Sequence, residues 1–373
     1  MIYDYLIVGA GYAGSVLAER IATQLDKKVL IVEQRNHIAG NSYDYFDDYG
    51  VLVHKYGPHI FHTNMKNVWD YLCQFTEWFP YYHHVLGVVE GKKIPVPFNL
   101  NSIYQVFPQN FAEKLEKLLI DKFGFGIKIP ILKLMEEKDE ELKFLADYIY
   151  KNIFLGYTVK QWGFKPEELD FSVSSRVPVF ISRDNRYFQD NYQGIPTAGY
   201  TKMFEKMIDH PNIHVLLNTD YKDILDTVKF NKMIFTGQID YFFDHLHGAL
   251  PYRSLDFKFK TFNQEKFQEV AQVNYPNNHD YTRITEFKHF GALKNPVTTV
   301  AYEYPQDFIQ GKNDPYYPVP NESNDALYAK YKEEIAKLNN SVYFVGRLAE
   351  YKYYNMDQIV GVALQVFKKK IAK

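Results

Sequence analysis

Three glycines and one acid near the N-terminus have the types and the spacing to bind a nucleotide. Gly9, Gly11 and Gly14 form a GxGxxG pattern directly after an apolar run. The first glycine permits a tight turn, the second lets the backbone approach a pyrophosphate, and the third lets a helix pack closely on a strand. Glu33 ends the next apolar run, where an acid binds the ribose hydroxyls of adenosine. The pattern predicts a dinucleotide site, and a glycine-rich packing turn is the alternative.

The segments around these residues are the ones that a dinucleotide site needs. Residues 3–8 form a short apolar run that glycine ends, residues 13–25 show helical spacing of apolar side chains, and residues 28–32 form a second apolar run. The helix would offer its free N–H groups and the positive end of its dipole to the phosphates. The sequence therefore predicts a strand–helix–strand unit of the Rossmann type.

The choice between NAD and FAD depends on the segments that follow. Residues 35–42 join a basic residue to a Gly-Asn turn, which resembles the extension along the cofactor pyrophosphate in flavoproteins of the glutathione-reductase-2 type. Ala39 departs from the glycine that is usual there. An apolar strand at 232–236 that ends at Thr236-Gly237, and another at 342–345 that is followed by Gly-Arg, resemble two further elements of this group. These features favour FAD.

The C-terminal segment adds a helix to the predicted cofactor site. Asn355 is a good N-cap for an amphipathic helix, and Asp357 lies in its first turn. In glutathione-reductase-2-type folds the start of this helix faces the flavin pyrimidine. Plain helix capping is an alternative reading of both residues, and the two readings are compatible.

The middle of the chain contains two other sequence patterns. Residues 107–123 and 139–154 show a period of 3.6 in their apolar positions, whereas residues 249–300 contain short alternating segments typical of antiparallel strands. The expected fold is α/β, with a discontinuous Rossmann-type FAD-binding domain (1–78, 195–245 and 340–373), an inserted helical domain (102–190) and an antiparallel β-sheet domain (79–101 and 246–339).

Composition excludes several classes of function. The 43 Lys+Arg and 45 Asp+Glu nearly cancel, which argues against nucleic-acid binding. No apolar run is long enough to span a membrane, no basic segment opens the chain, and Cys73 is the only cysteine, so we expect a cytoplasmic protein. Aromatic residues make up 17% of the chain, which suits a cleft for sugars and nucleotides as well as an aromatic core.

The histidines do not indicate a metal centre. His59 and His62 lie close together in the sequence, but no acid is placed to complete a ligand set, and one cysteine cannot build a thiolate site. We therefore expect no metal. We expect His59 to contact the cofactor, with a core histidine as the alternative.

Five blocks along the chain are rich in rare residues. They are residues 55–63 (KYGPHIFHT), 156–163 (GYTVKQWG), 192–196 (YQGIP), 199–202 (GYTK) and 346–354 (GRLAEYKYY). These blocks resemble the bacterial UDP-galactopyranose mutase family, and the resemblance runs in order along essentially the whole chain.

The resemblance implies an isomerase that contains FAD and interconverts UDP-galactopyranose and UDP-galactofuranose, a precursor of surface glycans. In this family N5 of the reduced flavin attacks the anomeric carbon, UDP leaves, and the sugar adduct opens and recloses without net redox change. The cofactor is thus active only when reduced, which requires a reductant in the cell. The resemblance also implies a homodimer.

The resemblance assigns roles to individual residues. Arg176 and Arg283 match two arginines that would neutralise the diphosphate as UDP leaves, and His59 completes the catalytic set. The matched substrate-binding residues are Tyr157, Thr158, Trp162, Arg176, Tyr187, Arg253, Arg283, Glu303, Tyr317 and Tyr353. The matched cofactor-binding residues are Gly9, Gly11, Tyr12, Ala13, Gly14, Glu33, Gln34, Gly40, Asn41, His59, Ile60, Gly237, Gly346, Arg347, Tyr354, Asn355, Met356, Asp357 and Ile359.

Two other classes of protein share such a scaffold. An FAD-dependent oxidoreductase of the amine-oxidase type would not need two arginines directed at a diphosphate. A nonenzymatic binding module would not need the complete set of glycines, ribose-binding acid and C-terminal flavin elements. Both alternatives are therefore weaker than the isomerase.

Overall fold

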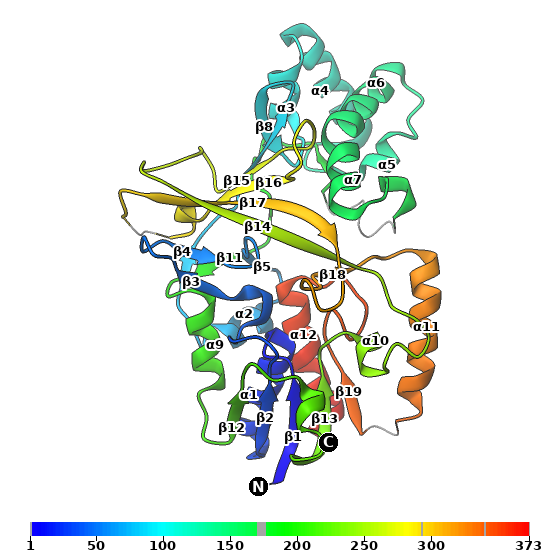
Figure 1. The fold of residues 1–373 in the computed structure, drawn as a ribbon. Helices are drawn as coiled ribbons and strands as arrows, with labels where there is room; N and C mark the ends of the chain where they lie inside the picture. The colour runs from blue at the N-terminus through cyan, green and yellow to red at the C-terminus, as the bar shows by residue number, and fades with distance from the viewer. Residues whose placement is uncertain (1, 170–176, 292–293, 339–340, 373) are drawn as a thin grey trace.

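A five-stranded parallel sheet forms the lower half of the molecule in the computed structural model, which describes residues 2–169, 177–291, 294–338 and 341–372 (Figure 1). Its strand order is β12-β2-β1-β13-β19, so strands from both ends and from the middle of the chain lie side by side. The strands are β1 (Ile2–Val8), β2 (Val29–Val32), β12 (Ile213–Leu216), β13 (Lys229–Phe235) and β19 (Val342–Phe344).

Alternating side chains of this sheet build a core on each face. Tyr5 and Ile7 of β1 pack with helices α1, α9 and α12, whereas Leu6 packs on the opposite face with Phe235 and Tyr221. The three helices are α1 (Tyr12–Leu25), α9 (Tyr200–Ile208) and α12 (Met356–Val366). The predicted Rossmann-type unit is confirmed, with β1, α1 and β2 within a residue or two of their expected bounds.

A seven-stranded sheet crosses the middle of the molecule above the parallel sheet (Figure 1). Its pairs are antiparallel, as expected, except that β15 pairs with β7 in parallel. This exception joins strands from distant parts of the chain, where no hairpin dictates direction. In order across the sheet the strands are β18 (Tyr317–Pro318), β14 (Tyr252–Phe262), β17 (Thr298–Asp307), β16 (Arg283–Glu286), β15 (Gln272–Asn274), β7 (Val85–Val89) and β8 (Lys92–Val96).

A helical unit lies beyond this sheet, at the top of Figure 1, and has its own core of leucines and isoleucines. The predicted helices are confirmed as α4 (Gln109–Phe123) and α6 (Glu140–Ile149), with α3 (Leu100–Val106) and α5 (Ile131–Leu134) beside them. A π-helical turn at Tyr150–Leu155 continues α6 directly into α7 (Gly156–Trp162). The helical unit therefore places α7 against β14 and β17 of the seven-stranded sheet.

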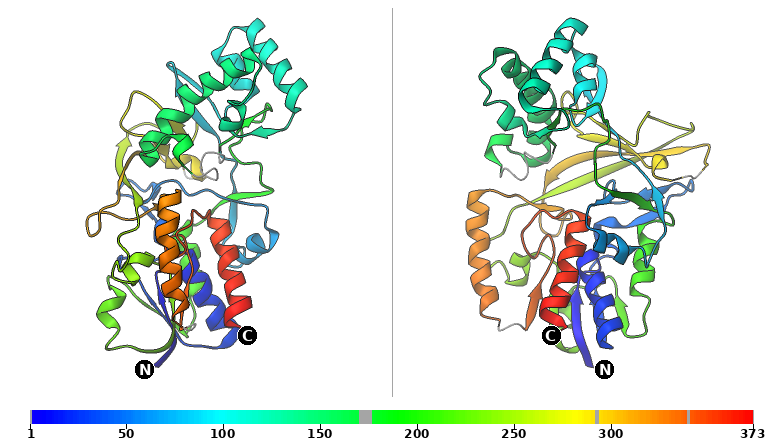
Figure 2. Two further views of the ribbon diagram at one scale, coloured as in Figure 1. Left: turned by 90° about the vertical axis from the view of Figure 1, so that its right-hand side faces the viewer. Right: turned by 180° about the vertical axis from the view of Figure 1, so that it is seen from behind.

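Helix α11 (Glu322–Ala336) lies beside the parallel sheet rather than the antiparallel one (Figure 2). Its Tyr331 packs with Ile239 of α10 (Ile239–Phe242) and with Phe344 of β19. The expected division of the chain into three domains stays a prediction. This helix and the loop with Gln310 and Tyr316 are parts of residues 246–339 that contact the nucleotide-binding side.

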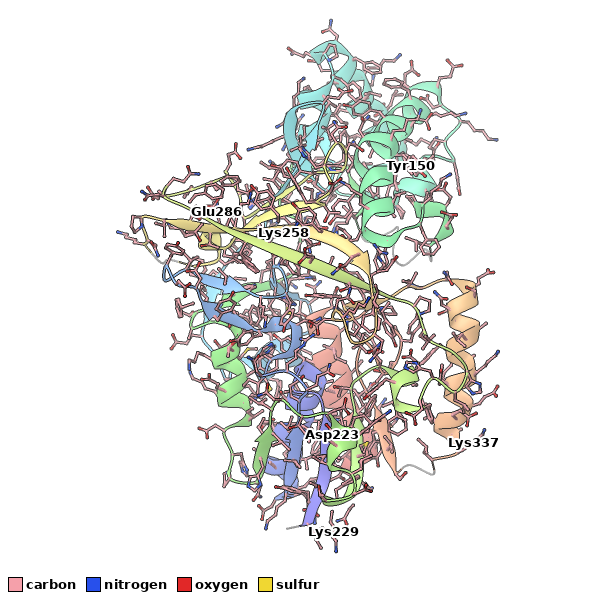
Figure 3. The ribbon with its side chains drawn as sticks, viewed as in Figure 1. Tyr150, Asp223, Lys229, Lys258, Glu286 and Lys337 are labelled. Atoms are coloured by element: carbon pink, nitrogen blue, oxygen red, sulfur yellow. The ribbon has the colours of Figure 1, made fainter. Side chains whose placement is uncertain are left out.

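Glu286, labelled in Figure 3, ties the end of β16 to the neighbouring loop and strand. Its fully buried carboxylate accepts hydrogen bonds from the backbone N–H groups of Phe267 (2.8 Å) and Gln268 (2.9 Å) and from the Thr298 hydroxyl (2.6 Å), and it lies 3.1 Å from Nε2 of His289. Burial raises the pKa of Glu286, but these hydrogen bonds more than offset it and hold the pKa below its usual value.

We expect Glu286→Gln to lower the free energy of unfolding by about 2 kcal/mol at pH 7, because an amide leaves part of this donor set unsatisfied. The pKa of Glu286 is lower in the folded protein than in the unfolded chain, where it is about 4.3. The ionised Glu286 therefore stabilises the fold above about pH 4.3, and this stabilisation is lost as the pH falls through the pKa of the folded state. Urea unfolding of both proteins at pH 7 and pH 3.5 checks this. A difference that is equal at both pH values would contradict it.

Candidate active site

The glycine turn between β1 and α1 brings backbone into a space that side chains would fill. Gly9 has φ +103°, and a Cβ on it would overlap the Thr236 hydroxyl. A Cβ on Gly14 would overlap the carbonyl oxygen of Gly9 and so push α1 away from β1. The N-terminus of α1 has no side-chain cap and no acid in its first turn, so its N–H groups remain available to an anion.

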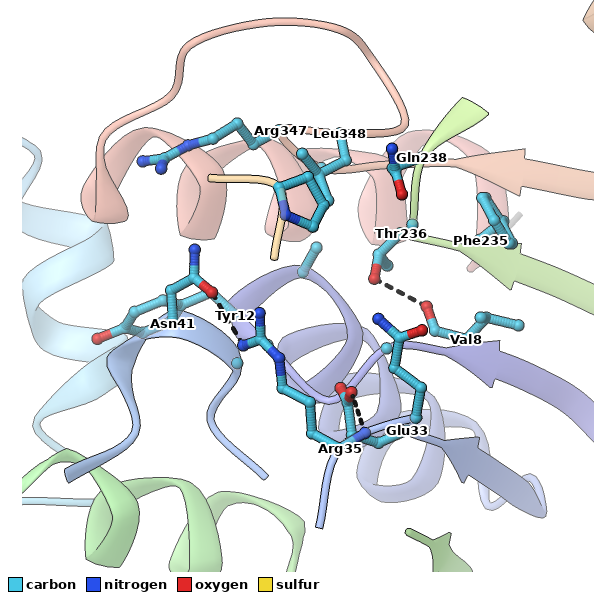
Figure 4. Close-up of a pocket in the computed structure, with 18 of the residues that line it drawn as sticks. Val8, Tyr12, Glu33, Arg35, Asn41, Phe235, Thr236, Gln238, Arg347 and Leu348 are labelled. Atoms are coloured by element: carbon cyan, nitrogen blue, oxygen red, sulfur yellow. Dashed lines mark hydrogen bonds between the residues drawn. The ribbon is translucent and has the colours of Figure 1, made fainter. Parts of the chain in front are cut away.

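A cavity of about 280 Å³ runs from this turn along the carboxyl ends of the parallel strands (Figure 4). Glu33 lies on its floor, and its two oxygens accept the backbone N–H groups of Ala10 (2.9 Å) and Arg35 (3.0 Å). Most of the predicted cofactor-binding residues line this cavity: Gly9, Gly11, Tyr12, Ala13, Glu33, Gln34, Gly40, Asn41, His59, Gly237, Gly346, Arg347, Tyr354, Asn355, Met356 and Ile359.

The residues of this cavity fit a dinucleotide such as FAD. Gln238 lines the cavity, and its buried amide nitrogen has no hydrogen-bond partner among the described residues. Two guanidiniums reach the cavity as well: Arg35, which donates to Asn41 (2.9 Å), and Arg347, which donates to the Tyr316 carbonyl (3.1 Å). Free helix N–H groups, two cations and a ribose-binding acid are the donor set that a pyrophosphate and its ribose require.

Three predicted cofactor residues lie outside the lining of this cavity. Gly14 acts through the packing of α1 on β1, and Asp357 accepts a hydrogen bond from the Thr63 hydroxyl (2.8 Å). Ile60 lines the neighbouring cavity instead. Ala39, which departs from the usual glycine, has φ +72°, the left-handed region that glycine prefers. The turn therefore keeps its geometry with an alanine in place.

A second cavity of about 220 Å³ opens beneath the seven-stranded sheet and shares a boundary with the first. Because the two cavities share lining residues, a ligand bound at that end of the first cavity would face the second cavity. The shared residues are Asn41, His59, Tyr316, Arg347, Asn355 and Met356.

His59 lies at this junction as a neutral imidazole. Its Nδ1 lies 2.8 Å from the Gly57 carbonyl oxygen, which can only accept, so Nδ1 carries the hydrogen. Burial lowers the pKa of His59 to about 3, and His54 and two arginines add to the effect. The ring therefore stays neutral near pH 7 and keeps Nε2 as an acceptor.

Arg283 and Glu303 form an ion pair on the face of the sheet toward the second cavity. The two residues are opposite each other in the β16–β17 register, and Nε of Arg283 donates to Glu303 Oε2 at 2.7 Å. Burial lowers the pKa of Arg283, but Glu303 and the nearby tyrosines more than offset it and raise the pKa above its usual value. The guanidinium is therefore permanently charged inside a largely desolvated cavity.

Aromatic side chains form the wall beside this ion pair. The Trp162 ring lies 5.2 Å from the Tyr317 ring and 5.7 Å from the Tyr353 ring, measured between centroids. Burial raises the pKa of Tyr157, which lies close enough to Arg283 and Glu303 to be affected by both charges. Such a wall offers flat apolar faces and phenolic hydroxyls together.

The structure brings most of the predicted substrate residues together. Arg283, Tyr187, Tyr317 and Tyr353 line the second cavity; Glu303 pairs with Arg283, and Tyr157, Thr158 and Trp162 belong to the adjoining α7. Arg176 lies outside the described residues. Arg253 is not brought to this cavity: it lines a different one, together with Trp162 and Asp307.

Other lining residues were not predicted. Tyr56, His62, His83, Phe188 and Gln272 line the second cavity, and Gln310, Pro315 and Tyr316 close over the first. Burial lowers the pKa of His83 to about 3, so it too is a neutral polar group. His83 lies two residues before β7, and Gln272 begins the adjacent strand β15, so only the sheet order brings them together.

Comparison with known proteins identifies two matching families. Residues 152–353 match the family described as UDP-galactopyranose mutase, and residues 7–75 match the NAD(P)-binding Rossmann-like domain. A probable UDP-galactopyranose mutase of Klebsiella pneumoniae is 38% identical, over 97% of this chain and 93% of its own. A dTDP-fucopyranose mutase of Escherichia coli is 33% identical over 96% of both chains, and a UDP-galactopyranose mutase of Mycoplasma genitalium is 36% identical over 97% and 93%.

Solved structures share the fold at low sequence identity. A reduced UDP-galactopyranose mutase superposes with a TM-score of 0.73 at 14% identity, covering 100% of this chain and 94% of that one. A putative protoporphyrinogen oxidase from Exiguobacterium gives a TM-score of 0.64 at 13% identity, covering 98% and 97%. The architecture is therefore shared by isomerases and oxidases.

The Rossmann-type unit, its cavity and these matches together define an FAD-dependent isomerase. The chain belongs to the UDP-galactopyranose mutase family, which the sequence resemblance predicted. Within the described residues no cluster of side chains could hold a metal ion, and no helix has the length and apolar character to cross a membrane.

We expect Gly14→Ala to remove at least nine-tenths of the bound flavin, because its Cβ would overlap the Gly9 carbonyl and open the phosphate turn. Gly291→Ala is the matched control, since a Cβ there meets no atom of the described residues within 4 Å and its φ is extended. Flavin absorbance per protein after gel filtration measures retention. Full flavin content in Gly14→Ala would show that the close packing of α1 on β1 is not required.

Proposed function

We propose that this chain interconverts UDP-galactopyranose and UDP-galactofuranose while it holds reduced FAD. The observation that carries this proposal is the position of Arg283: a permanently charged guanidinium in an aromatic cavity that adjoins the cofactor cavity at His59. The Klebsiella and Mycoplasma relatives that carry this name support the choice of substrate.

In this proposal the residues of the second cavity stabilise the leaving diphosphate. As the bond from the anomeric carbon to UDP breaks, negative charge gathers on the diphosphate, and Arg283 is placed to neutralise it. Tyr187, Tyr317 and Tyr353 line the same space and would donate hydroxyl hydrogen bonds. Arg176, assigned from sequence resemblance alone, would add a second guanidinium.

The cofactor and His59 would supply the other half of the chemistry. When bound and reduced, FAD supplies a nucleophilic nitrogen. His59 at the shared boundary is neutral, so it would accept a hydrogen bond from the cofactor or the sugar without adding charge. Trp162 and Tyr157 of α7 would pack on the uridine and keep water out of the cavity.

The cellular setting belongs to the same proposal. We propose that the protein works in the cytoplasm as a homodimer, draws on a cellular reductant for its flavin, and supplies galactofuranose for surface glycans. The single cysteine fits a reducing compartment. The family resemblance supports the other points.

The name of one relative indicates a second candidate substrate. The Escherichia coli relative is named for dTDP-fucopyranose, and its match covers as much of the chain as those of the UDP-galactopyranose mutases. Arg283 would serve either nucleoside diphosphate, because the diphosphate is common to both leaving groups. dTDP-fucose is therefore the comparison substrate for any assay.

We expect dithionite-reduced protein to convert UDP-galactofuranose into UDP-galactopyranose and the oxidised protein to be nearly inactive, because only reduced flavin is nucleophilic. Chromatography of products measures both, with dTDP-fucofuranose tested in parallel. Equal turnover by oxidised protein would contradict the proposed role of the flavin. Turnover of the dTDP-sugar alone would reassign the substrate.

We expect Arg283→Met to lower kcat/KM roughly 30- to 1,000-fold, which corresponds to a barrier that is higher by about 2–4 kcal/mol. FAD should stay bound. Lys258→Met is the matched control: it removes a cation from the opposite face of the same sheet, where Lys258 pairs with Tyr302 in the register. Steady-state kinetics and flavin absorbance check both variants. Unchanged kcat/KM in Arg283→Met would remove Arg283 from the mechanism.

A further inference from the structure

The last turn of α7 is the point where the helical unit meets the substrate cavity. The helix ends at Trp162, and Gly163 follows in the left-handed conformation (φ +76°). The side chain of Gln161 donates to the Tyr317 hydroxyl, and the Trp162 ring packs on Tyr317 and Tyr353. Small shifts of this turn would therefore move the wall of the substrate cavity.

Arg253 of β14 holds this turn by two of its carbonyl groups. Its Nε–H donates to the Gln161 carbonyl at 2.9 Å, and one Nη donates to the Lys160 carbonyl at 3.3 Å. Carbonyls in the last turn of a helix lack partners within the helix, and a cation there also faces the negative end of the helix dipole. The other Nη pairs with Asp307.

The position of Arg253 separates it from the substrate cavity. It lines a cleft of about 610 Å³ with Trp162, Gly163 and Asp307, whereas Tyr317 and Tyr353 line the substrate cavity. Leu255 lies on the same face of β14 and does reach the substrate cavity. Arg253 is two residues earlier, about 7 Å along the strand. Arg253 is opposite Tyr317 in the β14–β18 register, but its guanidinium contacts the carbonyls of α7 and Asp307 and is not part of the lining of the substrate cavity.

We propose that Arg253 is a positioning residue: it fixes the C-terminal turn of α7 so that Trp162 and Tyr317 shape the substrate cavity, and it does not contact the sugar nucleotide. This proposal rests on the proposed function of that cavity. The planar guanidinium suits two carbonyls that lie one residue apart, which a lysine ammonium on a flexible chain matches less well. Asp307 contributes little, because its side chain is 83% exposed.

A double-mutant cycle tests how Arg253 acts. We expect Arg253→Ala to lower kcat/KM about 10- to 100-fold in the otherwise unchanged holoenzyme, but less than about threefold when Trp162 is already alanine. The two losses would then fail to multiply, because Arg253 acts through the residue that was removed. Equal fold-losses in both backgrounds would overturn the proposal, since they would mean that Arg253 acts on the substrate by itself.

Hydrogen exchange of the ligand-free holoenzyme provides a readout without turnover. We expect the amides of residues 156–163 to exchange about tenfold faster in Arg253→Ala, with global unfolding changed much less. Unchanged exchange in this segment would overturn the proposal. If the wild-type holoenzyme isomerises no sugar nucleotide, the proposed function fails, but this measurement still decides whether Arg253 holds α7.

Two further variants complete the test. Arg253→Lys keeps the charge next to Asp307 but loses the planar fork, so we expect an intermediate loss; it also serves if the alanine variant does not fold. Asp307→Asn leaves both carbonyl bonds in place, so we expect kcat/KM within about twofold of wild type. A loss in Asp307→Asn as large as in Arg253→Lys would show that the ion pair, and not the helix terminus, is what Arg253 provides.

Discussion

The ion pair between Arg283 and Glu303 is the interaction on which the substrate cavity depends. A guanidinium that faces away from bulk water needs a countercharge, and Glu303, 1% exposed and directly across the strand pair, provides it. Glu303 engages Nε and one Nη, which is one edge of the guanidinium. Because a guanidinium carries five N–H donors, this arrangement would keep the charge in place while the others bind the diphosphate of the proposed substrate.

The ion pair lies next to the cofactor cavity only because the seven-stranded sheet packs against the nucleotide-binding unit. The boundary between the two cavities is built from widely separated parts of the sequence: the turn after β2, the segment before β5 (Phe61–Thr63), the connection from β17 to β18, and the start of α12. No single segment can make this boundary. The discontinuous parallel sheet, with β1, β13 and β19 adjacent, is what brings these segments to one edge.

Sequence alone predicted the parts of the site that depend on local geometry. Gly9, Gly11 and Glu33 follow from a turn whose backbone must approach a phosphate. Arg283 and the tyrosines were assigned by resemblance to the family. Gln310 and Tyr316 were not predictable, because their loop has no local pattern and reaches the cofactor cavity only through the fold. Arg253 shows the limit most clearly. Its strand was predictable, but the sequence does not show which positions of the strand reach the substrate cavity. Leu255 reaches it, whereas Arg253, about 7 Å away along the strand, contacts the end of α7 instead.

The same structure explains how one family contains relatives named for two sugar nucleotides. UDP-galactose and dTDP-fucose share a nucleoside diphosphate on the anomeric carbon, and they differ in the base, the ribose and the sugar C6. In the proposed function Arg283 would bind the shared diphosphate, so it would not discriminate between them. Discrimination must come from groups that form hydrogen bonds or apolar contacts without charge. Gln272 and the neutral His83 line the cavity in this way, and α7 supplies the aromatic faces. If Arg253 holds α7 by its terminus as proposed, substitutions on the aromatic faces of α7 would leave the position of Arg283 unchanged.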